Sequence, residues 1–169
     1  RDERGAEIKD NPARNLRVRG TGDARAPFFT DQDEKRLIYE LSQMSNPNHL
    51  RLTKLALTTG FRRSELLSLT WRNIDLNKKF FYIHRKNCAA RDSYPAMRIV
   101  PLPEKARKIL EELNERNGKV IELSKGAARN GFDKARKRAG LQTLRFHDLR
   151  HIAISRMWSS GMNALEISA

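Results

Sequence analysis

Cysteine and long apolar runs are the scarcest features of this 169-residue sequence. Its one cysteine, Cys88, excludes an intrachain disulfide and any zinc cluster built on cysteines, and we interpret it as a passive loop residue. No apolar run is long enough to span a membrane, and no secretory signal is recognisable. We therefore expect a protein of a reducing compartment, either free in the cytoplasm or held at the nucleoid.

Acidic residues are also in short supply. The sequence has 34 Lys and Arg against 20 Asp and Glu, which gives a formal net charge of +14. An excess of this size indicates a polyanionic partner, DNA or RNA first, because phosphates release condensed counterions when basic side chains neutralise them. The alternative is a basic surface without such a partner, as in some ribosome-associated proteins. No carboxylates cluster as Mg²⁺ ligands, so the sequence predicts neither a metal cofactor nor a metal-dependent nuclease.

Apolar residues make up 38% of the sequence, and their spacing predicts one domain that is mainly α-helical. Residues 1–26 are polar and rich in arginine, and we interpret them as a linker or the tail of a preceding domain. The folded domain is expected over residues 27–169. Helices are predicted at residues 31–44, 49–59, 64–69, 103–117, 127–139 and 147–160, with another beginning near Asn163. Strand-like segments at 71–76, 80–84 and 98–102 predict a small antiparallel β-sheet, and hence an α+β fold.

A histidine and an arginine near the end of the sequence share one face of a predicted helix. His147 and Arg150 are three residues apart and therefore project in the same direction. Leu149, Ile152 and Ala153 fall on the opposite face and are expected to be buried. His147 and Arg150 would then point into a groove. The alternative is that both lie on a helix face exposed to solvent, which would show the same spacing.

A second candidate cation follows the glycine that is expected to end the second helix. Arg62 comes just after Gly60, and Glu65 stands three residues further along. A carboxylate at that spacing can hold a guanidinium in a fixed orientation through charge-assisted hydrogen bonds. An ordinary surface ion pair is the alternative, and spacing alone does not choose between Arg62 and its neighbour Arg63.

The predicted helix over residues 127–139 carries a dense group of cations. We interpret them as contacts to the backbone or a groove of a nucleic acid, and a solvated basic helix face is the alternative. They are Lys134, Arg136, Lys137 and Arg138.

Several of these segments, in order, resemble the conserved boxes of tyrosine recombinases, the phage-integrase family. Residues 57–71 (LTTGFRRSELLSLTW) resemble the first box, T-G-x-R-x-x-E-L, which places the catalytic arginine at Arg62 and the supporting acid at Glu65. The predicted hairpin resembles the one that carries the family's catalytic lysine, and Lys86 is the matching position. This hairpin is longer than the turn common in the family, which leaves the adjacent Arg85 as the competing candidate.

The second box is found near the end of the chain. Residues 146–151 (FHDLRH) resemble the pattern H-x-L-R-H, which makes His147 and Arg150 catalytic and His151 a supporting residue. The resemblance covers residues 25–169 with the boxes in the family's order and spacing. It implies the catalytic-domain fold of the integrases, truncated at the C-terminus.

The chemistry implied by this resemblance is strand transfer on double-stranded DNA, without a metal or other cofactor. A tyrosine would attack the phosphodiester, form a 3′-phosphotyrosyl link and free a 5′-hydroxyl. Arg62 and Arg150 would clamp the nonbridging oxygens. Lys86 would protonate the leaving oxygen, and His147 would orient the nucleophile or exchange a proton with it.

Two parts of the family pattern are expected to lie outside this chain. The third box, a Leu-Gly-His motif followed by the nucleophilic tyrosine, is expected after Ala169, since Tyr39, Tyr82 and Tyr94 stand elsewhere. The N-terminal core-binding domain is also expected to lie outside this chain. Without the nucleophilic tyrosine, the chain as given is expected to be inactive. The full-length protein is expected to act as a tetramer on DNA, in a bacterial or phage-infected cytoplasm. A non-enzymatic basic DNA-binding module and a type IB topoisomerase-like enzyme are the alternatives.

Overall fold

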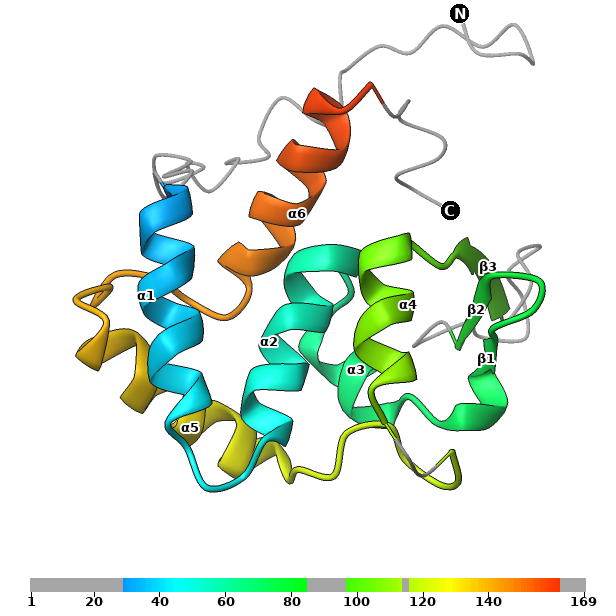
Figure 1. Ribbon diagram of the computed structural model, residues 1–169, viewed down its shortest axis with the longest axis horizontal. Helices are drawn as coiled ribbons and strands as arrows, with labels where there is room; N and C mark the ends of the chain where they lie inside the picture. Colours follow the sequence, from blue (N-terminus) through cyan, green and yellow to red (C-terminus); the bar gives the residue numbers. More distant parts are fainter. Residues whose placement is uncertain (1–28, 85–96, 114–115, 162–169) are drawn as a thin grey trace, which may run out of the picture.

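The computed structural model describes residues 29–84, 97–113 and 116–161, and helices account for most of them (Figure 1). The helices are α1 (Asp31–Ser42), α2 (Asn48–Thr59), α3 (Arg63–Ser68), α4 (Glu104–Glu111), α5 (Lys125–Arg138) and α6 (Asp148–Ser159), with the 3-10 helix η1 (Trp71–Asn73). The strands are β1 (Ile74–Asp75), β2 (Phe80–His84) and β3 (Met97–Pro101). They form an antiparallel sheet in the order β1-β2-β3, so the predicted α+β class is confirmed. Within these ranges no helix is both long and apolar enough to cross a membrane. Residues 1–26, Cys88 and the helix expected near Asn163 lie outside the described residues.

Local sequence signals set the ends of the first two helices. At the start of α1, the Thr30 hydroxyl accepts a hydrogen bond from the Asp33 amide at 3.1 Å, and the Asp33 carboxylate accepts one from the Thr30 amide at 2.9 Å. The bond from the Thr30 amide is the main reason that the pKa of Asp33 falls to about 2. α2 ends at Gly60, whose φ of 65° lies in the left-handed region that favours glycine. Both ends were predicted from the sequence.

The segment 71–76 was expected to be a strand, and this prediction is wrong for its first half. It forms η1 and then the two-residue strand β1. The Asn73 side-chain oxygen accepts hydrogen bonds from the Thr70 hydroxyl at 2.6 Å and from the Thr70 amide at 3.2 Å. These two bonds turn the chain before it enters the sheet.

α4 was expected to run to Gly118, but it ends at Glu111. The Gly118 carbonyl accepts a hydrogen bond from the Trp71 amide at 3.1 Å, and the Val120 amide donates one to the Leu69 carbonyl at 3.0 Å. The residues around Gly118 therefore run alongside the segment that precedes η1. A longer α4 would prevent this pairing.

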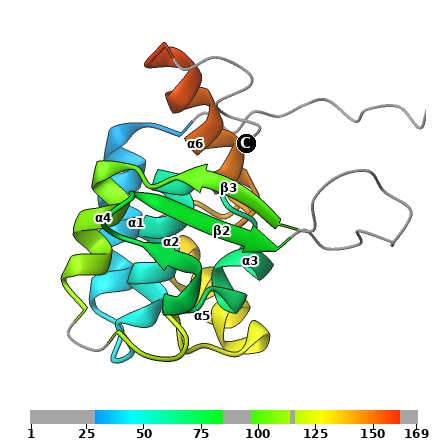
Figure 2. The same ribbon diagram turned by 90° about the vertical axis from the view of Figure 1, so that its right-hand side faces the viewer.

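α2 is at the centre of the helical layer and packs against α1, α3, α4, α5 and α6. The sheet lies beside α3 and α4, on the side away from α1 and α5 (Figures 1 and 2). Phe81 of β2 is fully buried and meets Phe61 edge to face, with 5.1 Å between ring centroids. The short link from α2 to α3, which contains Phe61 and Arg62, is thus held between the helices and the sheet.

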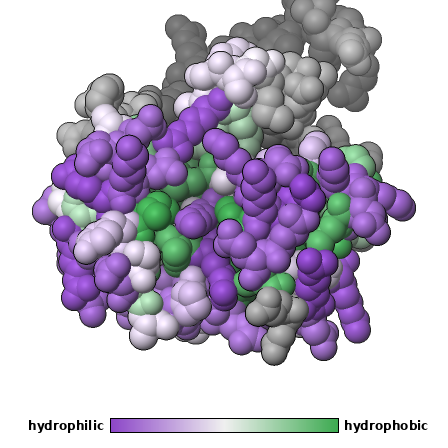
Figure 3. All heavy atoms as spheres, viewed as in Figure 1, coloured by the Kyte–Doolittle hydropathy of each residue, from purple (hydrophilic) through white to green (hydrophobic). Residues whose placement is uncertain are grey.

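A close contact also joins α2 to α5. Gly131 of α5 lies against the imidazole of His49, because a Cβ added to this glycine would be only 2.2 Å from the His49 Cε1. Burial in this contact lowers the pKa of His49. Hydrophilic side chains cover most of the molecular face shown in Figure 3, in keeping with the net charge of +14.

Candidate active site

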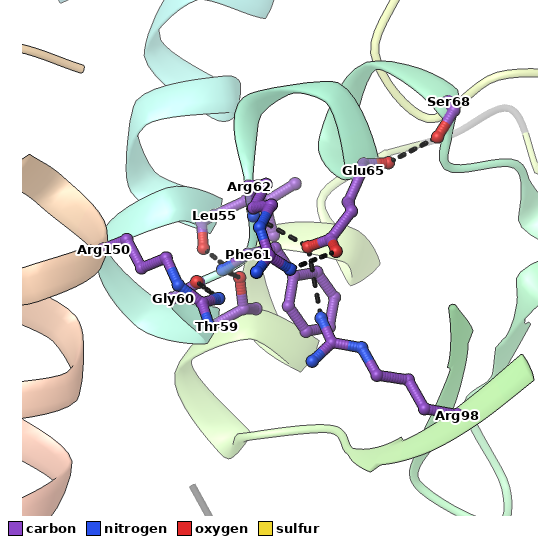
Figure 4. A network of polar contacts seen from close by, with 9 residues as sticks. All are labelled: Leu55, Thr59, Gly60, Phe61, Arg62, Glu65, Ser68, Arg98 and Arg150. Carbon is purple, nitrogen blue, oxygen red and sulfur yellow. Dashed lines mark hydrogen bonds and ion pairs between the residues drawn. The ribbon is translucent and has the colours of Figure 1, made fainter. Parts of the chain in front are cut away.

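The turn after α2 brings Arg62 next to α6. A Cβ at Gly60 would lie 3.6 Å from the Ala153 Cβ and 3.9 Å from the Arg150 carbonyl oxygen, so α6 packs closely against this turn. The Arg150 Nη1 donates a hydrogen bond to the Gly60 carbonyl (Figure 4). Two segments that are 90 residues apart in the sequence are therefore joined where both candidate arginines lie.

The Glu65 carboxylate is the centre of the polar network in Figure 4. Its Oε2 accepts hydrogen bonds from the Arg62 backbone amide at 2.8 Å and from the Arg98 Nη2 at 3.1 Å. Its Oε1 accepts one from the Arg62 Nη1, also at 3.1 Å. Arg98 in turn lies over the Phe61 ring, 5.6 Å from its centroid. Glu65 thus holds two guanidinium groups in fixed directions, as predicted for Arg62.

Burial and a neighbouring charge both act against the cationic form of Arg150. Burial lowers the pKa of its guanidinium, the positive charge of Arg62 lowers it further, and Glu65 opposes the shift. An arginine nevertheless stays protonated in proteins, so the two groups keep like charges close together. An anion bound between them would relieve this repulsion.

His147 immediately precedes the first turn of α6 and is followed one turn later by His151. The two imidazoles meet edge to face, with 5.0 Å between ring centroids. Burial lowers the pKa of His147 first, and the nearby charges of His151 and Arg150 add to this effect. His147 is therefore mostly neutral at pH 7 and can accept a proton. On the other side of the helix, Leu149 is buried, as predicted.

Arg62, His147 and Arg150 line one cleft of about 380 Å³, which confirms the prediction that they converge. The other lining residues are Phe61, Arg63, Ser64, Leu67, Lys125, Arg145 and Phe146. Among the described residues that line this cleft, none is acidic. Elsewhere in the described ranges, too, no three His, Cys, Asp or Glu side chains gather in a way that could hold a metal ion. The cleft is thus suited to an anionic ligand.

Among the described residues, the other predicted site residues do not line this cleft. Lys86 lies outside the described residues. Arg136 donates hydrogen bonds to the Asp133 carboxylate at 2.7 Å and to the Gln142 carbonyl, and so joins the end of α5 to the following turn. The other three cations that were predicted as DNA contacts are exposed and lie outside the cleft lining: Lys134, Lys137 and Arg138. Contact of these three cations and of Arg136 with DNA stays a prediction.

Arg98 is the member of the site that sequence reasoning missed. It was assigned only to the strand that closes the hairpin, yet its side chain is 12% exposed and pairs with Glu65. The alternation of inward and outward residues along β3 is the sequence signal that could have identified Arg98. Arg98 and Val100 face inward, whereas Ile99 between them is 54% exposed. A charged residue at an inward position of a strand indicates a buried partner.

Comparison with known proteins agrees with this geometry. A model of the phage integrase family matches residues 27–169. The chain is 32% identical to a shufflon-specific DNA recombinase of Escherichia coli over 95% of its length, and 26% identical to the integrase of Salmonella phage P22 over 92%. It spans 41% of the length of each of these relatives.

Solved structures show the same fold. The catalytic domain of bacteriophage HP1 integrase matches with a TM-score of 0.64 and 22% identity, over 82% of this chain and 75% of that one. XerA recombinase matches with a TM-score of 0.63 and 20% identity, over 84% and 53%. A lambda integrase dimer bound to a COC′ core site matches with a TM-score of 0.61 and 18% identity, over 79% and 41%. The chain therefore belongs to the phage integrase family.

Proposed function

We propose that the cleft is the catalytic site at which a longer protein containing this chain cuts and rejoins double-stranded DNA. The observation that carries this proposal is the convergence of Arg62 and Arg150 on a cleft whose described lining has no acid. Glu65 offsets the repulsion between these two cations only in part, and an anion bound between them would lower the remaining cost in free energy. A backbone phosphate is the anion that a strand-transfer enzyme would bind there.

The described side chains of the site have complementary roles in this proposal. Arg62 and Arg150 bind the nonbridging oxygens, on which negative charge develops in the transition state. Glu65 accepts one hydrogen bond from the Arg62 guanidinium, whose direction it fixes, and a second from the Arg62 backbone amide. Arg98 also donates a hydrogen bond to this carboxylate. His147, neutral at pH 7, orients the nucleophile or exchanges a proton with it.

Membership of the family supports the remaining parts of the mechanism. A tyrosine, expected after Ala169, attacks the phosphorus atom and forms a 3′-phosphotyrosyl link, while the 5′-oxygen leaves with a proton from Lys86. The covalent link conserves the bond energy of the phosphodiester, so rejoining requires no ATP. The lambda integrase structure contains a DNA core site. We extend DNA binding to this chain, and propose that the longer protein acts in the cytoplasm as a tetramer on its DNA.

A DNA duplex that the longer protein binds is first selected from a random-sequence library. The test then measures covalent adducts between the protein and this duplex. Adducts are counted on denaturing gels in the presence of EDTA. Arg150→Ala and Arg62→Ala should each lower the rate at least about 100-fold, the typical effect of removing a transition-state hydrogen-bond donor. The matched control is Arg72→Ala, an exposed arginine outside the cleft lining, which should keep the wild-type rate.

Each alternative function gives a different result. Unchanged adduct formation in the Arg150→Ala protein, or its loss on chelation, would overturn the proposal. DNA binding without any adduct would favour the non-enzymatic module. Relaxation of a supercoiled plasmid without joining of two sites would favour a topoisomerase-like enzyme.

A further inference from the structure

The cleft contains more cations than one phosphate requires. Besides Arg62 and Arg150, it is lined by three further cations that come from three separate segments: Arg63, Lys125 and Arg145. They belong to the first turn of α3, the first residue of α5 and the loop before α6. Within the described part of the chain, none of these three side chains forms an ion pair with a carboxylate. Their charges are therefore available to a ligand.

Two buried aromatic rings join the loop before α6 to α5, and Arg63 of α3 contacts one of them. Phe146 is buried and meets Phe132 of α5 edge to face, with 5.1 Å between centroids. The Arg63 guanidinium lies 5.8 Å from the Phe146 centroid. The Arg145 amide donates a hydrogen bond to the Asp148 carboxylate at 2.7 Å, which fixes the backbone of the loop. Packing and a hydrogen bond thus hold the backbone of the loop that carries Arg145.

We propose that Arg63, Lys125 and Arg145 form a second phosphate site, which binds a neighbouring phosphate of the DNA strand whose scissile phosphate lies between Arg62 and Arg150. The proposal rests on the proposed function. A cleft of about 380 Å³ is in the size range that accommodates whole small-molecule ligands, and so has room for more than one phosphate group. A DNA strand presents one charge per about 3.4 Å of helix axis, so a bound strand brings further phosphates to the cleft.

This site differs from the basic end of α5 that the sequence singled out. From Lys125 to Arg138, α5 rises roughly 20 Å, so the two ends of the helix meet different parts of a duplex. Phosphate contacts position DNA without reading its sequence. The second site should therefore set where the strand lies in the cleft, and contribute equally to the binding of all sequences.

The test compares two triple variants of the 169-residue chain that remove the same charges. The first, Arg63→Gln, Lys125→Gln and Arg145→Gln, removes the cluster. The control, Arg72→Gln, Lys78→Gln and Arg116→Gln, removes two arginines and one lysine that are exposed and outside the cleft lining. Binding of a fluorescent duplex is measured by anisotropy over a series of KCl concentrations.

The cluster variant should flatten the slope of log affinity against log salt by about 2 to 3, because each phosphate that is no longer neutralised lowers the slope by about 0.9. The control should change it by less than about 1. Equal changes in the two variants would overturn the second site. Because Arg63 also supports Phe146, the single variant Lys125→Gln, at an exposed position, is measured as well. It should flatten the slope by about 1, and an unchanged slope would count against the site.

Adduct formation by the longer protein separates failure of this inference from failure of the proposed function. In the cluster variant, a high DNA concentration should restore the adduct rate, because the second site binds and positions DNA. In the Arg150→Ala protein, it should not. If the wild-type protein forms adducts but the two triple variants bind DNA alike, only the second site is wrong. If no protein forms adducts while the cluster variant alone shows the flatter slope, only the catalytic proposal is wrong.

Discussion

Replacing Glu65 by glutamine tests the part of the site that organises the arginines. The change keeps the size of the side chain but removes the charge that pairs with Arg62 and Arg98, each at 3.1 Å. Arg150 already bears the repulsion of Arg62 and Arg98, which Glu65 partly offsets. The charges of Arg62, Arg98 and Arg150 would then lose the opposing charge of Glu65.

The loss of stability expected for Glu65→Gln follows from how exposed each of its two ion pairs is. At 3.1 Å, two unit charges interact by about 5 kcal/mol at an effective dielectric constant of about 20, which is a ceiling before desolvation is subtracted. The Arg62 side chain is 57% exposed, so its pair contributes less than about 1 kcal/mol. Arg98 and Glu65 are both 12% exposed, and breaking a pair this buried costs up to about 3–5 kcal/mol. Glutamine keeps a carbonyl acceptor, so we expect a total loss of about 2–3 kcal/mol.

Thermal unfolding at pH 7, followed by circular dichroism, measures this loss. The Tm of Glu65→Gln should fall by about 6–10 °C for a domain of this size. The matched control is Glu111→Gln, which breaks a more exposed ion pair with Arg107 and should change the Tm by less than about 2 °C. Added inorganic phosphate should raise the Tm more in Glu65→Gln than in the wild type, because the anion replaces the missing charge. A Tm within about 2 °C of wild type, or equal stabilisation by phosphate, would refute this reasoning.

Three further predictions concern single residues. Replacing a mid-helix glycine by alanine usually raises the free energy of unfolding by about 0.5–1 kcal/mol. Gly131→Ala should instead lower it by about 1–2 kcal/mol in urea unfolding, because the new Cβ meets His49, and adding His49→Ala should recover this loss. A Gly131→Ala protein more stable than the wild type would contradict the packing. The pKa of Asp33 is lowered from 3.8 to about 2, so its stabilising contribution is present above pH 3.8 and is lost as the pH falls towards 2. Asp33→Asn should therefore flatten the dependence of the free energy of unfolding on pH in this range, and an unaltered dependence would contradict the role of Asp33 at the helix start. The pKa of His147, measured by NMR titration, should lie below 6.5 in the free protein and rise when phosphate binds. A value of 6.5 or more without phosphate would contradict the effects of desolvation and of the nearby positive charges.

Features that depend on a few neighbouring residues could be predicted from the sequence. The start of α1 at Asp31 and the end of α2 before Gly60 depend on local hydrogen bonds and backbone preference, and both were predicted. The pairing of Arg62 with Glu65 spans one helical turn and was also found. The convergence with Arg150 depends on the whole fold, and it was expected only because the motifs resemble those of a known family.

Features that depend on distant contacts were missed. The end of α4 depends on the pairing of the residues around Gly118 with the segment before η1. The contact of Arg98 with Glu65 spans 33 residues and needs the hairpin to fold over α3. In each case a partner that local spacing cannot identify decides the role of the residue.

The most direct test of the central claim is to locate an anion of phosphate size in crystals of this chain. Tungstate serves as the probe, because its anomalous scattering identifies it without ambiguity. We expect one tungstate within hydrogen-bonding distance, about 3 Å, of the guanidinium groups of both Arg62 and Arg150, and no anion at this position in crystals of Arg150→Ala. Tungstate bound only at Lys134, Lys137 and Arg138, with the cleft empty, would contradict the claim that the cleft binds the scissile phosphate.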